Sequence, residues 1–439
     1  MPSPTVNPFH LAWFTSFNAP AWRNPWAGDT GSSWFTGDYH ISMVRQMERA
    51  GFDFIMFEDS TMVAEALGGT AEMDLKHGIH SPKMDPFPLL PVLARETSHI
   101  GLIATGSTSF YPPFILARAM ATMDHLTRGR VGWNIVTSSE DIAAQNYGLD
   151  ALPPHDERYD RAEEFVEVVE ALWDSWEPGA IVMDREAGRY ADHTKVHPIH
   201  YAGKFHKVRG PLNMPAGPQG HPVLCQAGGS PKGRDFAARH ANAIVVTQPL
   251  LPKMKEYRAD IRARAERFGR NPDDIKVLFH VSPVIGETED EARDLHRRQF
   301  GMTDPLAIER VLAMTGAVTE IDFSQYDLDA PFPQDLTTNG HQSVLNDLMA
   351  RNKGKTLRQS LSERAQLGPQ MVGTISSVAD QMEAAMEQTG GDGFLLLAAP
   401  HTRRYIDTIC SGLAPELRRR GLIRDGYRHQ LFKDNLLDF

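Results

Sequence analysis

Short apolar runs alternate with longer amphipathic stretches along the chain, and most of the apolar runs end in small polar residues. Such runs begin near residues 9, 53, 100, 131, 222, 243, 276 and 393. A short apolar run bounded by turn residues is typical of a parallel strand that is buried on both faces. The clearest run, GRVGWNIVTSS at 129–139, ends in Thr137, Ser138 and Ser139. That ending is expected of a strand that opens onto a polar site.

Apolar residues at helical spacing fill the intervals between these strands. Helices are predicted over 38–50, 89–97, 114–126, 156–176, 233–240, 253–268 and 289–298, with one more over about 404–419. The helix over 38–50 stops at Gly51, a residue type favoured just after a helix. In the long helix over 156–176, apolar residues recur every three or four positions and predict one buried face.

Eight strands joined by helices predict a parallel α/β fold, and eight is the number that closes a (β/α)8 TIM barrel. The competing architecture, an open doubly wound sheet, would usually carry a GxGxxG motif after its first strand. The corresponding turn here is rich in Trp and Pro and lacks that motif, so the barrel is favoured. We expect a single barrel domain over 1–439 with insertions near 60–87, 178–221 and 301–370, because long connections usually form lids or extra structure.

Composition and charge narrow the class of protein. The chain has 439 residues, 41% of them hydrophobic, and a net charge of -11. Without a stripe of Lys and Arg, nucleic acid is not expected as a partner, and no apolar stretch approaches the length of a membrane span. The two cysteines, Cys225 and Cys410, cannot build a disulfide framework. The N-terminus has no signal-peptide pattern. We therefore expect a soluble, cytoplasmic enzyme.

The chemistry of a barrel enzyme lies at the carboxyl ends of its strands, and here those ends carry hydroxyls and glycines. They read Asp59-Ser60, Thr105-Gly106-Ser107, Thr137-Ser138-Ser139, Gly228-Gly229-Ser230 and Thr247-Gln248. The turn at Gly229 and Ser230 precedes a helix, whose free N–H groups and dipole suit a phosphate. A simple tight turn is the alternative. Asn134, inside a strand, is either bonded to the backbone or directed at a ligand.

Histidines stand out in two places. His155 and Tyr159 lie one helical turn apart and share a face, so they either contact a phosphate or ring, or form a helix cap with a packed tyrosine. Four more histidines fall in the second insertion, at His193, His197, His200 and His206. Their spacing matches no familiar metal site and no cysteine accompanies them, so we expect a solvated hairpin and no metal.

Several long motifs resemble one known group of proteins. They are GRVGWNIVTS with the preceding Tyr111-Pro112-Pro113, HDERYDRAEEFVEVVEALWDSW, KVHPIHYAGKFHKVRGPLNMPAGPQGHPVLCQAGGSPKGRDFAARHA, DGFLLLAA and LRRRGLIRDGYRHQLFKDNLL. They resemble a flavin monooxygenase group within the bacterial-luciferase-like superfamily. This group includes nitrilotriacetate monooxygenase component A, dibenzothiophene-sulfone monooxygenase and long-chain alkane monooxygenase. The resemblance spans nearly the whole chain and is weakest from about 300 to 370.

The resemblance implies a (β/α)8 barrel that receives reduced FMN from a separate NAD(P)H-dependent flavin reductase. The reduced flavin would react with O2 to give a flavin C4a-(hydro)peroxide, which oxygenates a small organic substrate. By the same resemblance, Asp59 and Thr105 lie near the flavin ring. The residues that hold the phosphate end are His155, Tyr159, Gly229 and Ser230. Asn134 is a further flavin contact, and Ser138 is the candidate catalytic group that hydrogen-bonds the flavin peroxide or the substrate.

The first loop bears on the substrate. The tryptophans in this loop and in the strand before it either line an apolar pocket or fasten the loop to the barrel; they are Trp13, Trp22, Trp26 and Trp34. Arg23 is the only evident cation there, so an aromatic or apolar substrate is expected rather than a polyanionic chelate. Relatives of this kind usually form homodimers or homotetramers. Two alternatives stay open: an oxidoreductase that uses the deazaflavin F420 without oxygen, and a non-catalytic flavin-binding protein.

Overall fold

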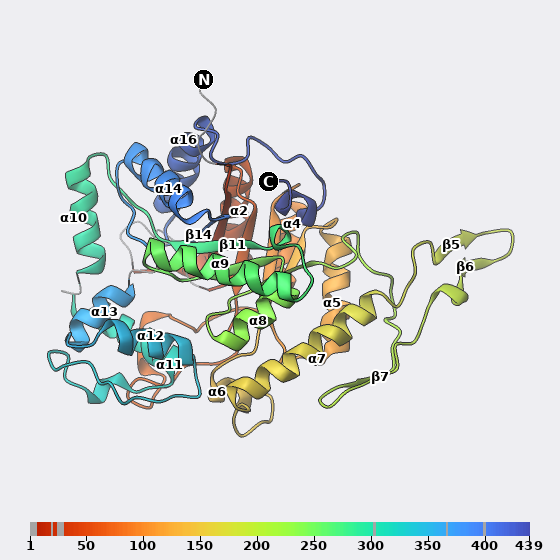
Figure 1. Cartoon of the computed structure of the whole chain (residues 1–439), viewed down its shortest axis with the longest axis horizontal. Helices are drawn as coiled ribbons and strands as arrows, with labels where there is room; N and C mark the ends of the chain where they lie inside the picture. The colour runs from red at the N-terminus through yellow and green to blue at the C-terminus, as the bar shows by residue number, and fades with distance from the viewer. Residues whose placement is uncertain (1–6, 19–20, 24–29, 302–303, 366–367, 398–400) are drawn as a thin grey trace.

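The computed structural model describes residues 7–18, 21–23, 30–301, 304–365, 368–397 and 401–439. Its centre is a closed barrel of eight parallel strands (Figure 1), in the order β1-β2-β3-β4-β9-β10-β11-β14 around the ring. The strands are β1 His10–Ser16, β2 Phe54–Glu58, β3 Gly101–Ser107, β4 Val131–Val136, β9 Val223–Gln226, β10 Ala243–Val246, β11 Lys276–Val281 and β14 Gly393–Leu397. Each begins at the predicted position or one residue after it, so the predicted (β/α)8 barrel is confirmed.

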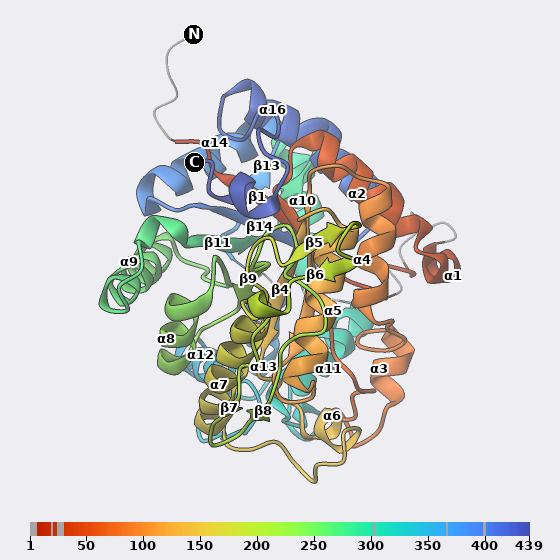
Figure 2. The same ribbon diagram turned by 90° about the vertical axis from the view of Figure 1, so that its right-hand side faces the viewer.

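Helices surround this barrel, as Figure 2 shows from a second direction. They are α2 Asp38–Ala50, α4 Pro86–Arg95, α5 Pro113–Leu126, α7 His155–Trp173, α8 Pro231–His240, α9 Leu251–Arg267 and α14 Ile375–Thr389. After β14 the chain continues through α15 Arg403–Asp407, a π-helical segment Thr408–Leu413 and α16 Ala414–Arg419. The outward-facing strand residues and the apolar faces of these helices form one large core, which includes Trp133, Phe165 and Ile244.

The sequence analysis missed the helix that packs on the barrel between β11 and β14. The predicted helix at 289–298 exists as α10 Glu289–Phe300, but it packs on the short strands β12 Val284–Ile285 and β13 Val372–Gly373. The helix that joins β11 to β14 on the barrel is α14, which packs against α9 and α16. Its first turn is stabilised by Thr374, whose hydroxyl accepts a hydrogen bond from Ser377 N. Its buried residues Val378, Met382, Ala385 and Met386 recur at helical spacing, so the sequence pattern could have revealed this helix.

The first and third insertions pack together, and the second lies apart from them. The segment 60–87, with α3 Glu72–His77, shares a second small core with α11 Pro305–Thr319, α12 Gln342–Arg351 and α13 Leu357–Ala365. The second insertion follows helix α7 rather than a strand and projects away from the barrel as two ribbons (Figure 1). Their strands are β5 Ile181–Asp184, β6 Arg189–Ala191, β7 Tyr201–Ala202 and β8 Lys207–Val208.

The amino-terminal end of the barrel is closed by the segment that follows α16. Phe432, in α17 Phe432–Leu436, packs among the interior strand residues beside Phe54. It comes so close that a Cβ atom at Gly101 would lie 2.5 Å from its ring, which is why β3 begins with glycine. With this end filled by side chains, the carboxyl ends of the strands form the open mouth of the barrel. No helix among the described residues is long and apolar enough to span a bilayer.

Candidate functional site

The residues that face the barrel interior change from apolar to polar towards the mouth. Because side chains alternate along a strand, residues two apart share a face. Below the mouth the interior layer contains Ala12, Met56, Ile103 and Leu278, all buried. Two residues further along the same strands stand Phe14, Glu58, Thr105 and His280. The alternation therefore builds a rim of mainly polar side chains directly above an apolar floor.

Asn134 and Thr105 lie side by side on this rim, and their hydrogen bonds run in one direction. The two residues are paired in register between β4 and β3. Thr105 Oγ1 donates to Phe57 O at 2.8 Å and accepts from Asn134 Nδ2 at 2.9 Å. The Asn134 amide must therefore point its oxygen away from Thr105. That oxygen, Oδ1, is buried and has no partner among the described residues.

An unpartnered buried acceptor is uncommon in proteins and calls for an explanation. From the sequence, the Asn134 side chain was expected either to bond to the backbone or to face a ligand. The amide bonds to a side chain, Thr105, and leaves an acceptor without a partner in the barrel interior. A ligand that carries an N–H or O–H group at the mouth would satisfy this acceptor. The structure thus brings Thr105 and Asn134 together, and the pair has one hydrogen-bond acceptor, Asn134 Oδ1, without a partner among the described residues.

Carboxylates gather at the end of β2. Glu58 accepts two hydrogen bonds from Lys83 Nζ, at 2.7 and 3.0 Å, and one from Ser16 Oγ at 2.7 Å. Burial would raise the pKa of Glu58, but Lys83 outweighs burial and lowers it. Asp59 behaves differently, because burial, with help from Glu58 and Asp85, raises its pKa to about 6 against the opposing effect of Lys83. Asp59 is thus the carboxyl at this site that changes charge closest to neutral pH.

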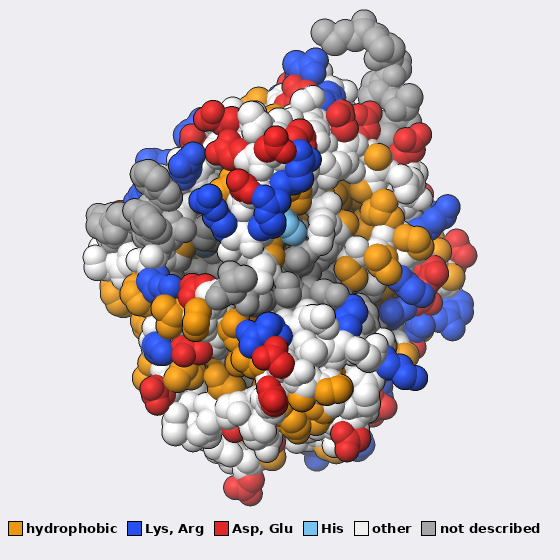
Figure 3. Space-filling view, turned by 90° about the vertical axis from the view of Figure 1, so that its left-hand side faces the viewer, with side chains coloured by type: hydrophobic (Ala, Val, Ile, Leu, Met, Phe, Trp, Pro, Cys, Tyr) orange, Lys and Arg blue, Asp and Glu red, His pale blue; other side chains and the backbone are white. Residues whose placement is uncertain are grey.

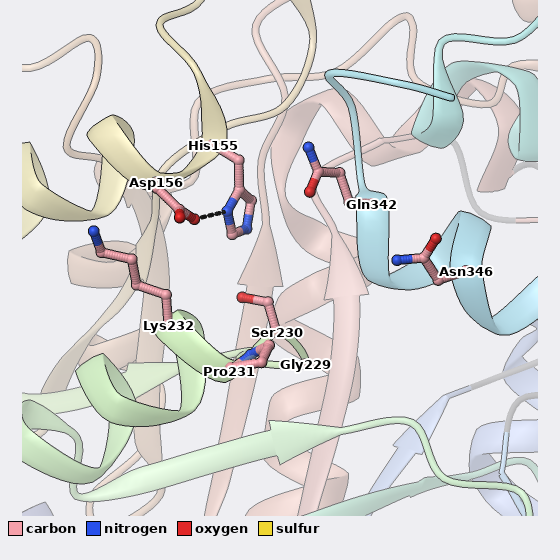
Figure 4. Close-up of a pocket in the computed structure, with 8 residues that line it drawn as sticks. All are labelled: His155, Asp156, Gly229, Ser230, Pro231, Lys232, Gln342 and Asn346. Carbon is pink, nitrogen blue, oxygen red and sulfur yellow. Dashed lines mark hydrogen bonds and ion pairs between the residues drawn. The ribbon is translucent and has the colours of Figure 1, made fainter. Parts of the chain in front are cut away.

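A pocket of about 480 Å³ opens beside the mouth, between helices α7, α8 and α12. Figure 4 shows its residues: His155 from α7 and Ser230 from the start of α8 point into the same space, and the α12 amides face them from the other side. The lining consists of His155, Asp156, Gly229, Ser230, Pro231, Lys232, Gln342 and Asn346. The predicted residues His155, Gly229 and Ser230 are therefore brought together.

The start of α8 has the features of a phosphate site. Ser230 caps the helix, accepting a hydrogen bond from Gly233 N at 3.1 Å, and Pro231 occupies the first turn. Since Pro231 has no N–H and those of Gly233 and Arg234 bond to Ser230, the N–H of Lys232 and the helix dipole are left to favour an anion. Lys232, which forms an ion pair with Asp160, adds a cation at the rim of the pocket. A cavity lies in front of this turn, so there is room for an anion beside it.

Tyr159 reaches the same helix from α7. A Cβ atom at Gly233 would lie 2.7 Å from the Tyr159 hydroxyl oxygen, so only glycine lets that hydroxyl approach the first turn of α8. Its ring lies 5.1 Å from the ring of His155, centroid to centroid, as their spacing predicted. Tyr159 itself is 8% exposed and lies behind the pocket wall. His155 Nδ1 is 2.8 Å from Asp156 Oδ1, which fixes the ring at the pocket entrance.

Ser138 stands in a strained conformation just after β4. Its φ of 57° places it in the left-handed region, which non-glycine residues adopt mainly at turns and functional sites. Its hydroxyl oxygen lies 2.7 Å from that of Ser107, at the end of β3. The two hydroxyls form a polar pair on the same side of the mouth as Thr105 and Asn134.

The histidines of the second insertion do not converge. His197 pairs with Glu177, at 2.6 Å, whereas His206 is buried against Phe165. The expectation of a solvated hairpin was therefore wrong for His206, whose imidazole packs on α7. Among the described residues no group of three or more His, Cys, Asp or Glu side chains is arranged to hold a metal ion.

The tryptophans that the structure describes fasten the first loop rather than line a pocket. Trp13 and Trp34 are fully buried in the large core. Trp22 donates through Nε1 to His77 O at 3.1 Å, which ties the loop to the segment 60–87. Trp26 lies outside the described residues. Arg23 forms an exposed ion pair with Asp304, at 3.4 Å.

Sequence reasoning missed several residues that the structure brings to the site. Lys83 carries no local signal, because it comes from an irregular loop. Gln342 and Asn346 are four residues apart on α12, a helix that the sequence analysis left inside an unassigned insertion. His280 and Thr247 also face the mouth, and their hydrogen bond joins β11 to β10. The alternation along β11 could have found His280, since it lies two residues beyond the interior Leu278.

A closed parallel barrel whose polar mouth lies at the carboxyl ends of its strands is the architecture of (β/α)8-barrel enzymes. The chain belongs to the luciferase-like monooxygenase family, whose model matches residues 10–393.

Similar proteins agree with this assignment over nearly the whole chain. Nitrilotriacetate monooxygenase component A of Aminobacter aminovorans is 38% identical over 411 residues, which cover 91% of this chain and 89% of that protein. Dimethyl-sulfide monooxygenase of Hyphomicrobium sulfonivorans is 35% identical, with 96% and 88% covered. The crystal structure of riboflavin lyase, which contains modified FMN and its substrate riboflavin, superimposes with a TM-score of 0.89 at 32% identity and covers 99% of this chain and 96% of that one. The resemblance read from the sequence motifs is confirmed.

Proposed function

We propose that this protein is an FMN-dependent two-component monooxygenase that uses reduced FMN and O2 to oxygenate a small organic substrate. The observation that carries the proposal is the pocket at the start of α8, formed by His155, Gly229 and Ser230 beside the polar mouth, in a chain of the luciferase-like monooxygenase family. A phosphate in this pocket would leave the attached ring system within the barrel mouth. The solved structure of a relative at 32% identity contains modified FMN.

The residues present fit a flavin mononucleotide. Ser230, Gly229 and His155 would hold its phosphate, with Tyr159 supporting the turn from behind. Gln342 and Asn346 face the same space from α12 and would close it. At the ring end, the unpartnered Asn134 Oδ1 requires a donor, and a flavin ring offers one in its imide N–H. Asp59 and Thr105 complete this end of the site.

When bound, reduced FMN would supply the two electrons that activate O2, and one atom of that O2 reaches the substrate. The protein's own residues bind, orient and shield it. The apolar floor of the barrel and the small core of 60–87 with α11–α13 keep water from the mouth. Ser138, paired with Ser107, is the hydroxyl that we assign to hydrogen-bonding near the reacting oxygen.

The proposed site holds flavin and substrate and includes no site for NAD(P)H, so another protein has to reduce the flavin. We infer that a separate NAD(P)H-dependent flavin reductase supplies it, in keeping with the name "component A" of one relative. We also propose that the chain acts in the cytoplasm as a homodimer or homotetramer.

A coupled assay tests the function. Purified protein is mixed with FMN, NADH, a flavin reductase and ¹⁸O₂, and a panel of uncharged aromatic and sulfur compounds is screened beside nitrilotriacetate. We expect one ¹⁸O atom in the product, and only when all components are present. Turnover without oxygen in the presence of reduced F420, or flavin binding without any product, would contradict the proposal. Faster turnover of nitrilotriacetate would overturn the expectation of an aromatic or apolar substrate.

A further inference from the structure

The rim of the barrel divides into two halves. The residues proposed to hold the flavin lie on or after the neighbouring strands β2, β3, β4 and β9. The other half of the ring consists of β10, β11, β14 and β1, which are also neighbours. Its interior-facing rim residues are Phe14, Thr247, His280 and Leu397, each partly exposed. Among these four residues, Phe14 and Leu397 are apolar, and the two polar ones, Thr247 and His280, are hydrogen-bonded to each other.

His280 is held firmly within this half. Its Nδ1 lies 2.6 Å from Thr247 Oγ1, and its ring meets that of Phe14 edge-on at 5.8 Å between centroids. The other ring nitrogen, Nε2, is shielded from solvent and has no hydrogen-bond partner among the described residues. It is therefore, like Asn134 Oδ1 in the opposite half, a buried polar atom with an unused hydrogen-bonding capacity.

The contact with Thr247 bears on which ring nitrogen of His280 carries the proton. Burial lowers the pKa of His280 to about 4, so the ring is neutral at physiological pH and has one N–H. Among the described residues, His280 Nδ1 is the one acceptor within reach of the Thr247 hydroxyl. If Thr247 donates to Nδ1, both groups are satisfied and the ring proton sits on Nε2. The half therefore presents a single N–H donor between two apolar side chains.

We propose that His280, oriented by Thr247, is a substrate-binding residue that donates a hydrogen bond from Nε2 to an acceptor oxygen of a small, uncharged, mainly apolar substrate. This inference rests on the proposed monooxygenase function and names the substrate class for that site. Phe14 and Leu397 contact the apolar body of the substrate. Thr247 is a positioning residue, because it acts through the imidazole.

The charges near the rim agree with an uncharged substrate. The Lys83 side chain is 4% exposed and forms an ion pair with Glu58. Arg23 forms an ion pair with Asp304. Neither cation is free to neutralise several carboxylates. Figure 3 shows the face opposite the projecting ribbons, where acidic, basic and apolar side chains are mixed and neither sign dominates.

The test compares two probes of equal shape, methyl phenyl sulfone and tert-butylbenzene, with nitrilotriacetate as an anionic third. Their binding to the protein–FMN complex is measured by calorimetry for the wild type and for His280→Leu, His280→Gln and Thr247→Val. The exposed His193→Leu, in the projecting ribbons, is the matched control. FMN affinity is measured separately for every variant.

We expect the wild type to prefer the sulfone over the hydrocarbon by about tenfold, the value of one good hydrogen bond. His280→Leu should abolish this preference, His280→Gln should restore most of it because its amide can donate from a similar position, and Thr247→Val should reduce it. FMN affinity should not change. Equal binding of the two probes to the wild type, no binding of either, tighter binding of nitrilotriacetate, or a preference that survives in His280→Leu would overturn the inference. If the wild type does not bind FMN at all, the proposed function itself fails.

Discussion

Single residues at this site are informative mainly through the hydrogen bonds that they do not make. The sequence shows Asn134 as a polar residue in an apolar strand. The orientation of its amide depends on Thr105, whose hydroxyl donates to Phe57 O and therefore accepts from Asn134 Nδ2. The alternation along β11 could have shown that His280 faces the interior, but not that its Nδ1 bonds Thr247, 33 residues away, or that its Nε2 has no partner among the described residues. The pattern along one strand shows which side chains face the interior. Which of their donors and acceptors lack a partner depends on the neighbouring strands.

The phosphate assignment is tested at Ser230. Replacing it by alanine removes a hydroxyl from the pocket and the cap from α8, so FMN affinity should fall roughly tenfold. Riboflavin, which lacks the phosphate, should bind the variant and the wild type equally. Fluorescence titration measures both ligands, with Ser98→Ala as an exposed control and Ser230→Thr, which keeps a capping hydroxyl, as the rescue. Unchanged FMN affinity in Ser230→Ala would refute the assignment.

At the scale of elements, the strands were predictable and the insertions were not. Buried parallel strands are continuous apolar runs, so all eight were found within one residue of their observed starts. Helices α11–α13 escaped because they pack on their own small core with the segment 60–87, which no local pattern reveals. The same reason hid Gln342 and Asn346. The second predicted insertion follows helix α7, at the opposite end of the barrel from the mouth, so it lies outside the site.

The segment after α16 provides a prediction about acid stability. Arg424 forms an ion pair with Asp53, which also bonds His10 Nδ1 at 2.9 Å. Burial would raise the pKa of Asp53, but Arg424 and His10 outweigh burial and lower it to about 2. Because an unfolded aspartate has a pKa of about 3.9, this shift corresponds to roughly 2–3 kcal/mol of stability.

A lowered pKa means that this stability is fully present above about pH 4 and is lost as the pH falls towards about 2. Asp53→Asn should therefore lower the free energy of unfolding at pH 7 by about 3 kcal/mol or more, since it leaves Arg424 buried without its charge partner. Its deficit relative to the wild type should shrink between pH 4 and pH 2. Denaturant unfolding at a series of pH values measures both effects, with Asp425→Asn, an exposed carboxylate in the same segment, as the control. A deficit that does not depend on pH would contradict the ion-pair explanation.

The whole molecule is a barrel that is filled at one end and open at the other. Phe432 and its neighbours fill the amino-terminal end, and the polar rim, the α8 pocket and two of the insertions meet at the carboxyl end. The sequence motifs predicted this family and this face, because the barrel fold fixes where strand ends meet. They could not predict how the mouth divides between flavin and substrate, since that division depends on which strands are neighbours around the ring.

The central claim is that the barrel mouth holds FMN, and a crystal structure of the protein soaked with FMN tests it most directly. The account predicts the phosphate against Ser230 and the start of α8, and the ring in the mouth with a flavin N–H donating to Asn134 Oδ1. The half of the rim around His280 should stay open above the ring. A flavin ring bound outside the barrel mouth, or a phosphate away from α8, would contradict the account.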